Sequence, residues 1–150
     1  MASIETSRSI DAPQTQVWDV VADPRKFEQW NTLHTRWQGE APTELALGSQ
    51  VTEVVSIMKI PNTVDFTAVA FEPPHRVSLE GKGTGGMKVS LTFSVIPDGE
   101  DKAVASIKVD VAGALLFGPM GKRIEKTLVA ELDTSLGRIA EMLQAPTISG

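Results

Sequence analysis

Three side chains in this 150-residue sequence could carry out acid–base chemistry if the fold placed them on one apolar surface: His34, Glu53 and Glu131. Histidine titrates near pH 6.5 and can exchange a proton at neutral pH. Two carboxylates that face each other across a cavity raise the pKa of one of them, and such a carboxyl group can act as a general acid. These residues are the catalytic candidates, and the elements that carry them decide whether they can meet.

Glu53 lies in a segment that alternates like a strand. If Val51, Val55 and Ile57 face the core, a period of two places Glu53 on the same face. In the simpler alternative, which we favour, Glu53 lies at the rim of the sheet. A pair between Glu53 and Glu131 across a cavity requires the first arrangement.

Glu131 lies in a long helical pattern. At roughly 100° per residue it falls about 20° from Ile124, within the arc that also holds Leu128. A carboxylate in that arc needs a wet cavity or a partner, and Arg138 could be that partner. The ordinary alternative, slightly favoured, is a solvated flank of the helix.

His34 stands beside a turn, between two tryptophans. Trp30 and Trp37 each offer a large apolar face with one N–H donor, which suits the mouth of a ligand pocket as well as simple packing. His34 could act there as an acid–base group, although a lone histidine beside a turn is more often structural or exposed.

Composition narrows the class of protein. With 41% hydrophobic residues and no apolar run approaching ~18 residues, we expect one globular domain over residues 1–144, a short tail at 145–150, and neither signal peptide nor membrane span. A net charge of −5, with scattered Lys and Arg, argues against nucleic acid as a partner. The absence of cysteine excludes disulfides and fits a cytoplasmic protein. The two histidines have no ligand spacing, so we expect neither a metal nor a cofactor.

A long amphipathic helix is predicted near the end of the chain, from Leu115 to Leu143. Its apolar residues recur at spacings of three or four. They are Phe117, Met120, Ile124, Leu128, Leu132, Leu136, Ile139 and Leu143. A helix of roughly 25 residues is about 38 Å long and must pack on an equally large surface, which only the preceding segments can supply.

Those segments alternate between apolar and polar residues, and each break between them contains Gly or Pro, as in an antiparallel sheet. We predict strands at residues 2–10, 34–40, 49–59, 63–72, 75–82, 86–96 and 103–112, with one break at Pro61-Asn62. Two short helices follow the first strand, one around Val17–Val21 and one that begins at Asp23-Pro24 and carries Trp30.

Several separated motifs in this order resemble the START/Bet v 1-like (SRPBCC) superfamily, in its polyketide cyclase/dehydrase and lipid transport branch. The resemblance covers residues 2–143 and rests on Ile10-Asp11-Ala12-Pro13, Val17-Trp18, Asp23-Pro24 with Trp30, and Phe71-Glu72-Pro73-Pro74-His75-Arg76. Other motifs resemble an actinobacterial subgroup, some members of which are named as the toxin of a type II toxin–antitoxin pair. They are His34 with Trp37, Met58 with Pro61-Asn62, Gly85-Gly86, and Leu116-Phe117-Gly118-Pro119-Met120-Gly121.

The resemblance implies an α+β helix-grip fold, in which a curved seven-stranded antiparallel sheet wraps around a long C-terminal helix, with two short helices after strand 1. A cavity between sheet and helix would hold a small hydrophobic molecule, such as a lipid, a polyketide or an aromatic-like compound. The expected ligand-binding residues are Trp30, Trp37, Val55, Ile57, Phe66, Leu79, Leu91, Phe93, Ile107, Met120, Ile124, Leu128 and Glu131.

Three functions remain open at this point. The first is binding or transport of such a ligand. The second is a polyketide cyclase/aromatase-like enzyme that uses Glu131, Glu53 or His34, and it is less favoured because the chain has no tyrosine or cysteine for acid–base chemistry. The third is a toxin-like protein with an antitoxin-like protein partner. A homodimer is also compatible with the sequence.

Overall fold

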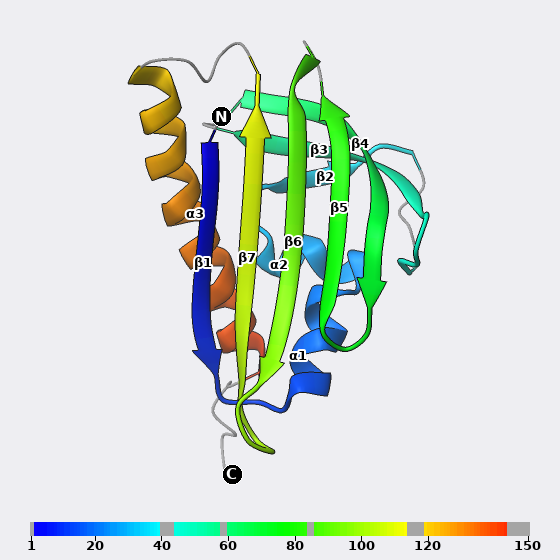
Figure 1. Ribbon diagram of the computed structural model, residues 1–150, viewed down its shortest axis with the longest axis vertical. Helices are drawn as coiled ribbons and strands as arrows, with labels where there is room; N and C mark the ends of the chain where they lie inside the picture. Colours follow the sequence, from blue (N-terminus) through cyan, green and yellow to red (C-terminus); the bar gives the residue numbers. More distant parts are fainter. Residues whose placement is uncertain (1, 40–43, 58–59, 84–85, 114–118, 144–150) are drawn as a thin grey trace.

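The computed structural model describes residues 2–39, 44–57, 60–83, 86–113 and 119–143 (Figure 1). In chain order the elements are β1 (Ala2–Ile10), α1 (Gln14–Val21), the 3₁₀ turn η1 (Pro24–Lys26), α2 (Phe27–Trp30), β2 (His34–Trp37), β3 (Gln50–Ile57), β4 (Ile60–Glu72), β5 (Arg76–Gly83), β6 (Lys88–Pro97), β7 (Ala103–Ala112) and α3 (Pro119–Leu143). The predicted α+β fold is confirmed within these ranges, with a seven-stranded antiparallel sheet and a long C-terminal helix.

The sheet has the strand order β1-β7-β6-β5-β4-β3-β2. The first and last strands in the chain, β1 and β7, therefore pair with each other. The other neighbours follow one another along the chain. In Figure 1, β2 and β3 run across the upper part of the molecule at a steep inclination to β7. The sheet is therefore strongly curved, and the helices lie within its curve.

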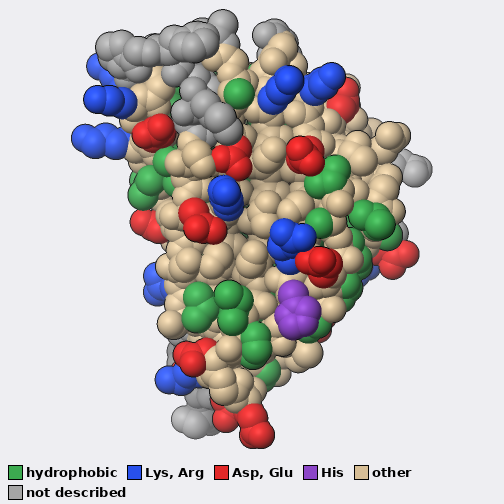
Figure 2. Space-filling model, viewed as in Figure 1, with side chains coloured by type: hydrophobic (Ala, Val, Ile, Leu, Met, Phe, Trp, Pro, Cys, Tyr) green, Lys and Arg blue, Asp and Glu red, His purple; other side chains and the backbone are tan. Residues whose placement is uncertain are grey.

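The face of the sheet toward the helices is apolar, as the alternation predicts. On β6, Val89, Leu91, Phe93 and Val95 are all at most 4% exposed. Burial of each such large side chain stabilises the fold by about 1.5–3 kcal/mol. Figure 2 shows the opposite face, where charged side chains of both signs are scattered. The period of two in the sequence indicates this arrangement, in which one face of the sheet is buried and the other is exposed to solvent.

The long helix α3 packs along β1 and also contacts α1, α2 and β7. Its buried residues include Ile124, Leu128, Leu132, Leu136 and Ile139, which are members of the predicted apolar stripe. The helix begins at Pro119, where a proline suits the first turn because its missing N–H would have no helical partner. The predicted start at Leu115 and the stripe residue Phe117 lie outside the described ranges.

The predicted break at Pro61-Asn62 is wrong. Strand β4 already begins at Ile60, and Pro61 pairs with Ser56 of β3. The physical reason is that β5 ends at Gly83, which pairs with Val64, so the first residues of β4 have a neighbouring strand on one side only. A proline can occupy such an edge position without removing a ladder hydrogen bond.

Gly81 of β5 allows β4 to approach closely. A Cβ at this position would lie 2.6 Å from the Asp65 backbone oxygen and 2.8 Å from the Phe66 ring. Because Phe66 pairs with Gly81 across the two strands, its ring occupies the space that a side chain would need. This contact packs Phe66 into the core on the inner face of the sheet.

Candidate functional site

A small cavity lies between the sheet and α3 and has a volume of about 10 Å³. This volume accommodates about one water molecule. Its lining consists of Asn31 and seven aliphatic side chains, Leu33, Val55, Val89, Leu91, Val109, Val111 and Leu128. Asn31 is itself buried, and its Oδ1 accepts a hydrogen bond from the Leu33 N–H at 3.0 Å. The cavity is therefore an apolar space with one polar side chain at its edge.

Three of the residues predicted to bind ligand, Val55, Leu91 and Leu128, line this cavity. Most of the others are buried in the surrounding core, namely Trp30, Phe66, Leu79, Phe93, Ile107 and Ile124. The side chains of Ile57 and Met120 lie outside the described part of the chain.

The predicted ligand-binding residues do not include five residues of the lining, Asn31, Leu33, Val89, Val109 and Val111. The three valines continue the alternation of Leu91 and Ile107, so extending the same period toward the ends of β6 and β7 would have found them. Asn31 and Leu33 lie between α2 and β2, where no periodic pattern identifies them.

His34 and Glu53 form a buried pair on β2 and β3. The His34 Nδ1 and the Glu53 Oε2 share a hydrogen bond, and the two side chains are 3% and 0% exposed. The favoured expectation that Glu53 lies at the rim of the sheet is therefore wrong, and its alternative, a position on the inner face, is the observed one. His34 begins β2 directly after a turn, as expected, and its side chain is buried, so the exposed alternative is wrong.

A bulge in β2 contributes to this arrangement. His34 pairs with Val55, but Trp37 pairs with Glu53, because the register shifts between His34 and Arg36. Strict alternation would place His34 and Trp37 on opposite faces, whereas both are partly buried and their ring centroids are 4.9 Å apart. The extra residue thus brings the imidazole and the indole to one side of the strand.

The electrostatics of the pair follow from its burial. Burial raises the pKa of Glu53 above the usual carboxyl value, while the hydrogen bond and the charge of His34 lower it. Only one carboxylate oxygen is used in this way. Among the described residues, Glu53 Oε1 is buried and has no hydrogen-bond partner, an arrangement that typically costs about 1–3 kcal/mol.

Aromatic rings enclose the imidazole of His34. The Phe27 ring lies edge-on to it with centroids 6.0 Å apart, and Phe27 also contacts Trp30, Trp37 and Phe93. The indole N–H groups have backbone acceptors, since Trp30 donates to Val20 O at 3.3 Å and Trp37 donates to Pro24 O at 3.1 Å. Both tryptophans therefore hold the short helices and β2 together, and their predicted ligand contacts stay predictions.

Glu131 is not among the residues that line the cavity, and its predicted contact with a ligand stays a prediction. Its side chain is half-buried on α3, and its backbone oxygen accepts a hydrogen bond from Thr32 Oγ1 at 3.0 Å. Within the described ranges it forms no ion pair with Arg138 and no pair with Glu53, so both hypothesised partnerships are wrong. The helical angle placed Glu131 near the buried arc, but the residue lies at the edge of that arc and is only half-buried.

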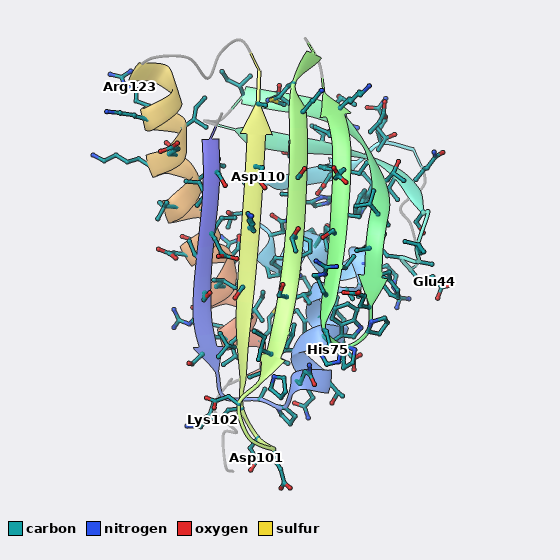
Figure 3. All side chains as sticks on the ribbon, in the orientation of Figure 1. Glu44, His75, Asp101, Lys102, Asp110 and Arg123 are labelled. Atoms are coloured by element: carbon teal, nitrogen blue, oxygen red, sulfur yellow. The ribbon has the colours of Figure 1, made fainter. Side chains whose placement is uncertain are left out.

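The second histidine is remote from the first. His75 is exposed on the turn between β4 and β5, beside α1, as Figure 3 shows, and its Nδ1 lies 3.1 Å from Gln14 Nε2. Nowhere in the described ranges do three His, Asp or Glu side chains stand close enough to hold a metal ion. The described helices also include none that is long and apolar enough to cross a membrane.

Comparison with known proteins identifies the family to which the chain belongs. Residues 1–144 match the model of the family described as Polyketide cyclase / dehydrase and lipid transport. The chain belongs to this family.

Two proteins of Mycobacterium tuberculosis (strain ATCC 25618 / H37Rv) are similar along nearly the whole chain. Rv1546, an uncharacterized protein, is 30% identical over 142 residues, which are 95% of this chain and 99% of that protein. Toxin Rv0910 is 32% identical over 136 residues, which are 91% of this chain and 94% of that protein.

Solved structures share the fold. A START superfamily protein from Mycobacterium smegmatis has a TM-score of 0.77 at 19% identity, covering 98% of this chain and 100% of that chain. Protein MLL2253 from Mesorhizobium loti has a TM-score of 0.72 at 14% identity, covering 97% and 99%. The START-like fold is thus common to chains with little sequence in common.

Proposed function

We propose that this protein binds a small hydrophobic molecule between the sheet and α3. The observation that carries the proposal is the cavity whose lining is aliphatic except for Asn31. Membership in a family whose description includes polyketides and lipid transport supports the same ligand class. Ligand pockets are commonly apolar with a few polar groups, which is the composition of this lining.

The cavity must enlarge before it can hold such a ligand. Its volume of about 10 Å³ is far below the roughly 300–1,000 Å³ of a typical ligand pocket. Aliphatic side chains break no hydrogen bond when they move, and an apolar ligand replaces the contacts that they lose. The free energy of binding therefore includes the cost of opening the cavity. The apparent affinity equals the affinity of the open form multiplied by the fraction of molecules that are open.

A pair of helix variants tests the site. Leu128 lines the cavity, whereas Leu132, one turn further along α3, is equally buried but does not line it. With N-phenyl-1-naphthylamine as a neutral fluorescent probe, we expect about one site per chain. Leu128→Phe should weaken probe binding by about tenfold or more because the ring occupies the space, while Leu132→Phe should leave the affinity unchanged.

Thermal unfolding separates occupation of the cavity from general damage. Leu132→Phe overpacks a filled region and should cost about 1–3 kcal/mol, whereas Leu128→Phe has the cavity to expand into and should cost less. Equal loss of probe binding in both variants, or no probe binding by the natural sequence, would contradict the proposed site.

A second candidate function follows from the relative named as a toxin, which is 32% identical over nearly the full length of both chains. If this chain shares that role, its induced expression in Mycobacterium smegmatis should reduce colony counts by about tenfold or more. Phe27→Ala, which weakens the core, is the matched control and should restore growth. If the protein is shown to be expressed and colony counts do not change on induction, the toxin-like function is excluded. The expectation of an antitoxin-like partner then has no support either.

A further inference from the structure

We propose that the ligand carries a neutral hydrogen-bond donor, an alcohol or phenol hydroxyl, and that this hydroxyl binds Oε1 of Glu53. The inference rests on the hydrophobic ligand site proposed above and adds the chemical class of the ligand. It concerns an atom that the fold buries and that has no partner within the described part of the chain.

The first support is the unpartnered oxygen itself. Glu53 is 0% exposed, its Oε2 is bonded to His34 Nδ1, and its Oε1 has no partner among the described residues. Folded proteins pair the large majority of their buried polar atoms, so each exception requires an explanation, and a functional role is one of them. A ligand group that completes the pairing would remove the penalty.

The second support is position. Glu53 and Val55 lie two residues apart on β3 and therefore face the same side, about 7 Å apart along the strand. Val55 lines the cavity, and so does Leu33, which directly precedes His34. The His34–Glu53 pair does not itself line the cavity, but Glu53 is the next position along β3 on the same face as Val55, which does. A ligand of two fused rings that fills the enlarged cavity and extends along β3 arrives at Glu53.

The third support is the chemistry of the oxygen. The hydrogen bond with His34 Nδ1 involves Oε2, so the lone pairs of Oε1 stay free to accept. A ligand carboxylate would place a second hydrogen-bond acceptor against it. A charged group of either sign would also lose its hydration among aliphatic and aromatic side chains. A neutral hydroxyl satisfies the oxygen without these costs, which favours alcohols and phenols over fatty acids.

Three ligands of nearly equal size provide the test: 2-naphthol, 2-methylnaphthalene and 2-naphthoate. By titration calorimetry with the natural sequence, 2-naphthol should bind at least about tenfold more tightly than 2-methylnaphthalene, because a hydrogen bond to a charged or buried acceptor is worth about that factor. This preference is opposite to the order of hydrophobicity of the two compounds. The carboxylate of 2-naphthoate should bind more weakly than 2-naphthol.

Variants assign the preference to Glu53. In the double variant His34→Phe with Glu53→Leu, the ratio of the two affinities should fall to about one. Ser135→Ala removes another buried polar side chain, which bonds the Thr32 N–H at 3.0 Å, and should keep the preference. Carboxyl ¹³C shifts in the natural sequence give a second measurement, since the Glu53 signal should move on addition of 2-naphthol and not of 2-methylnaphthalene.

The outcomes separate the two proposals. Equal affinities for 2-naphthol and 2-methylnaphthalene overturn the hydroxyl inference and leave the hydrophobic site standing. Failure of both compounds to bind overturns both proposals. A preference for 2-naphthol without any shift of the Glu53 carboxyl signal, or one that survives in the double variant, overturns the assignment to Glu53.

Discussion

Replacing His34 by alanine should destabilise the protein by about 3–5 kcal/mol near neutral pH, as measured by urea unfolding. The imidazole is the hydrogen-bond partner of Glu53 in the interior, and its removal leaves a buried carboxyl group with neither oxygen paired to a described residue. Breaking a buried pair by removing one partner costs this much because the remaining charge loses its compensation.

The size of this loss should depend on pH. Burial raises the pKa of Glu53 above the value of 4.5 that it has when exposed, and His34 is the group that opposes the rise. A carboxyl group with a higher pKa in the folded state than in the unfolded state favours folding where it is protonated and disfavours folding as the pH rises. The loss of unfolding free energy in His34→Ala should therefore be smallest near pH 4.5 and grow toward neutral pH.

The double variant His34→Phe with Glu53→Leu is the control for this prediction. Replacing both members of a buried pair by apolar side chains of similar size is often neutral or stabilising. It should lie within about 1 kcal/mol of the natural sequence and show no pH dependence from this site. A small, pH-independent deficit in His34→Ala would mean that water reaches Glu53, contrary to its burial.

Replacing Phe27 by alanine should also cost about 3–5 kcal/mol, the usual range for removing a buried phenylalanine ring. Phe27 is 0% exposed and its ring meets those of Trp30, Trp37 and Phe93 as well as the imidazole of His34. Chemical unfolding of Phe27→Ala and Phe27→Leu measures the effect, and the leucine variant should lose at most about 1.5 kcal/mol because it keeps most of the volume.

Phe27→Ala should in addition change the titration of Glu53. Burial is the largest cause that raises the pKa of Glu53, and the ring helps to exclude water from the pair. Water that enters the space left by the ring should bring this pKa down toward 4.5. The carboxyl ¹³C shift followed against pH measures the change, and an unchanged titration would show that other side chains suffice to keep the pair dry.

The secondary structure and its order were determined largely by the sequence itself. The alternation on β6 and β7 and the three- and four-residue spacing on α3 are local patterns, and each repeats the geometry of its own element. The order of these elements, with the motifs around Asp23-Pro24 and Phe71–Arg76, was enough to predict the helix-grip fold. Such patterns are readable because the residues that make them are close in the chain.

The site depended on tertiary structure. His34 and Glu53 lie on different strands, 19 residues apart, and a bulge in β2 shifts the register that brings them together. A period of two gave the face of Glu53 but not its depth, because depth depends on residues distant in the chain, such as Phe27 and Trp37, whose rings pack against its partner His34. A helical angle likewise could not separate the edge of the buried arc, where Glu131 lies, from its centre.

The cavity is the feature that the sequence determined least. Its volume is a small difference between two large volumes. One is the volume that the curved sheet and α3 enclose, and the other is the volume of the side chains that fill this space, including Val55, Leu91 and Leu128. Every residue of the core contributes to that difference, and none of them encodes it locally. The sequence therefore determined which side chains face inward, while only the packed tertiary structure decided where they leave a space and that Glu53 Oε1 has no partner among the described residues.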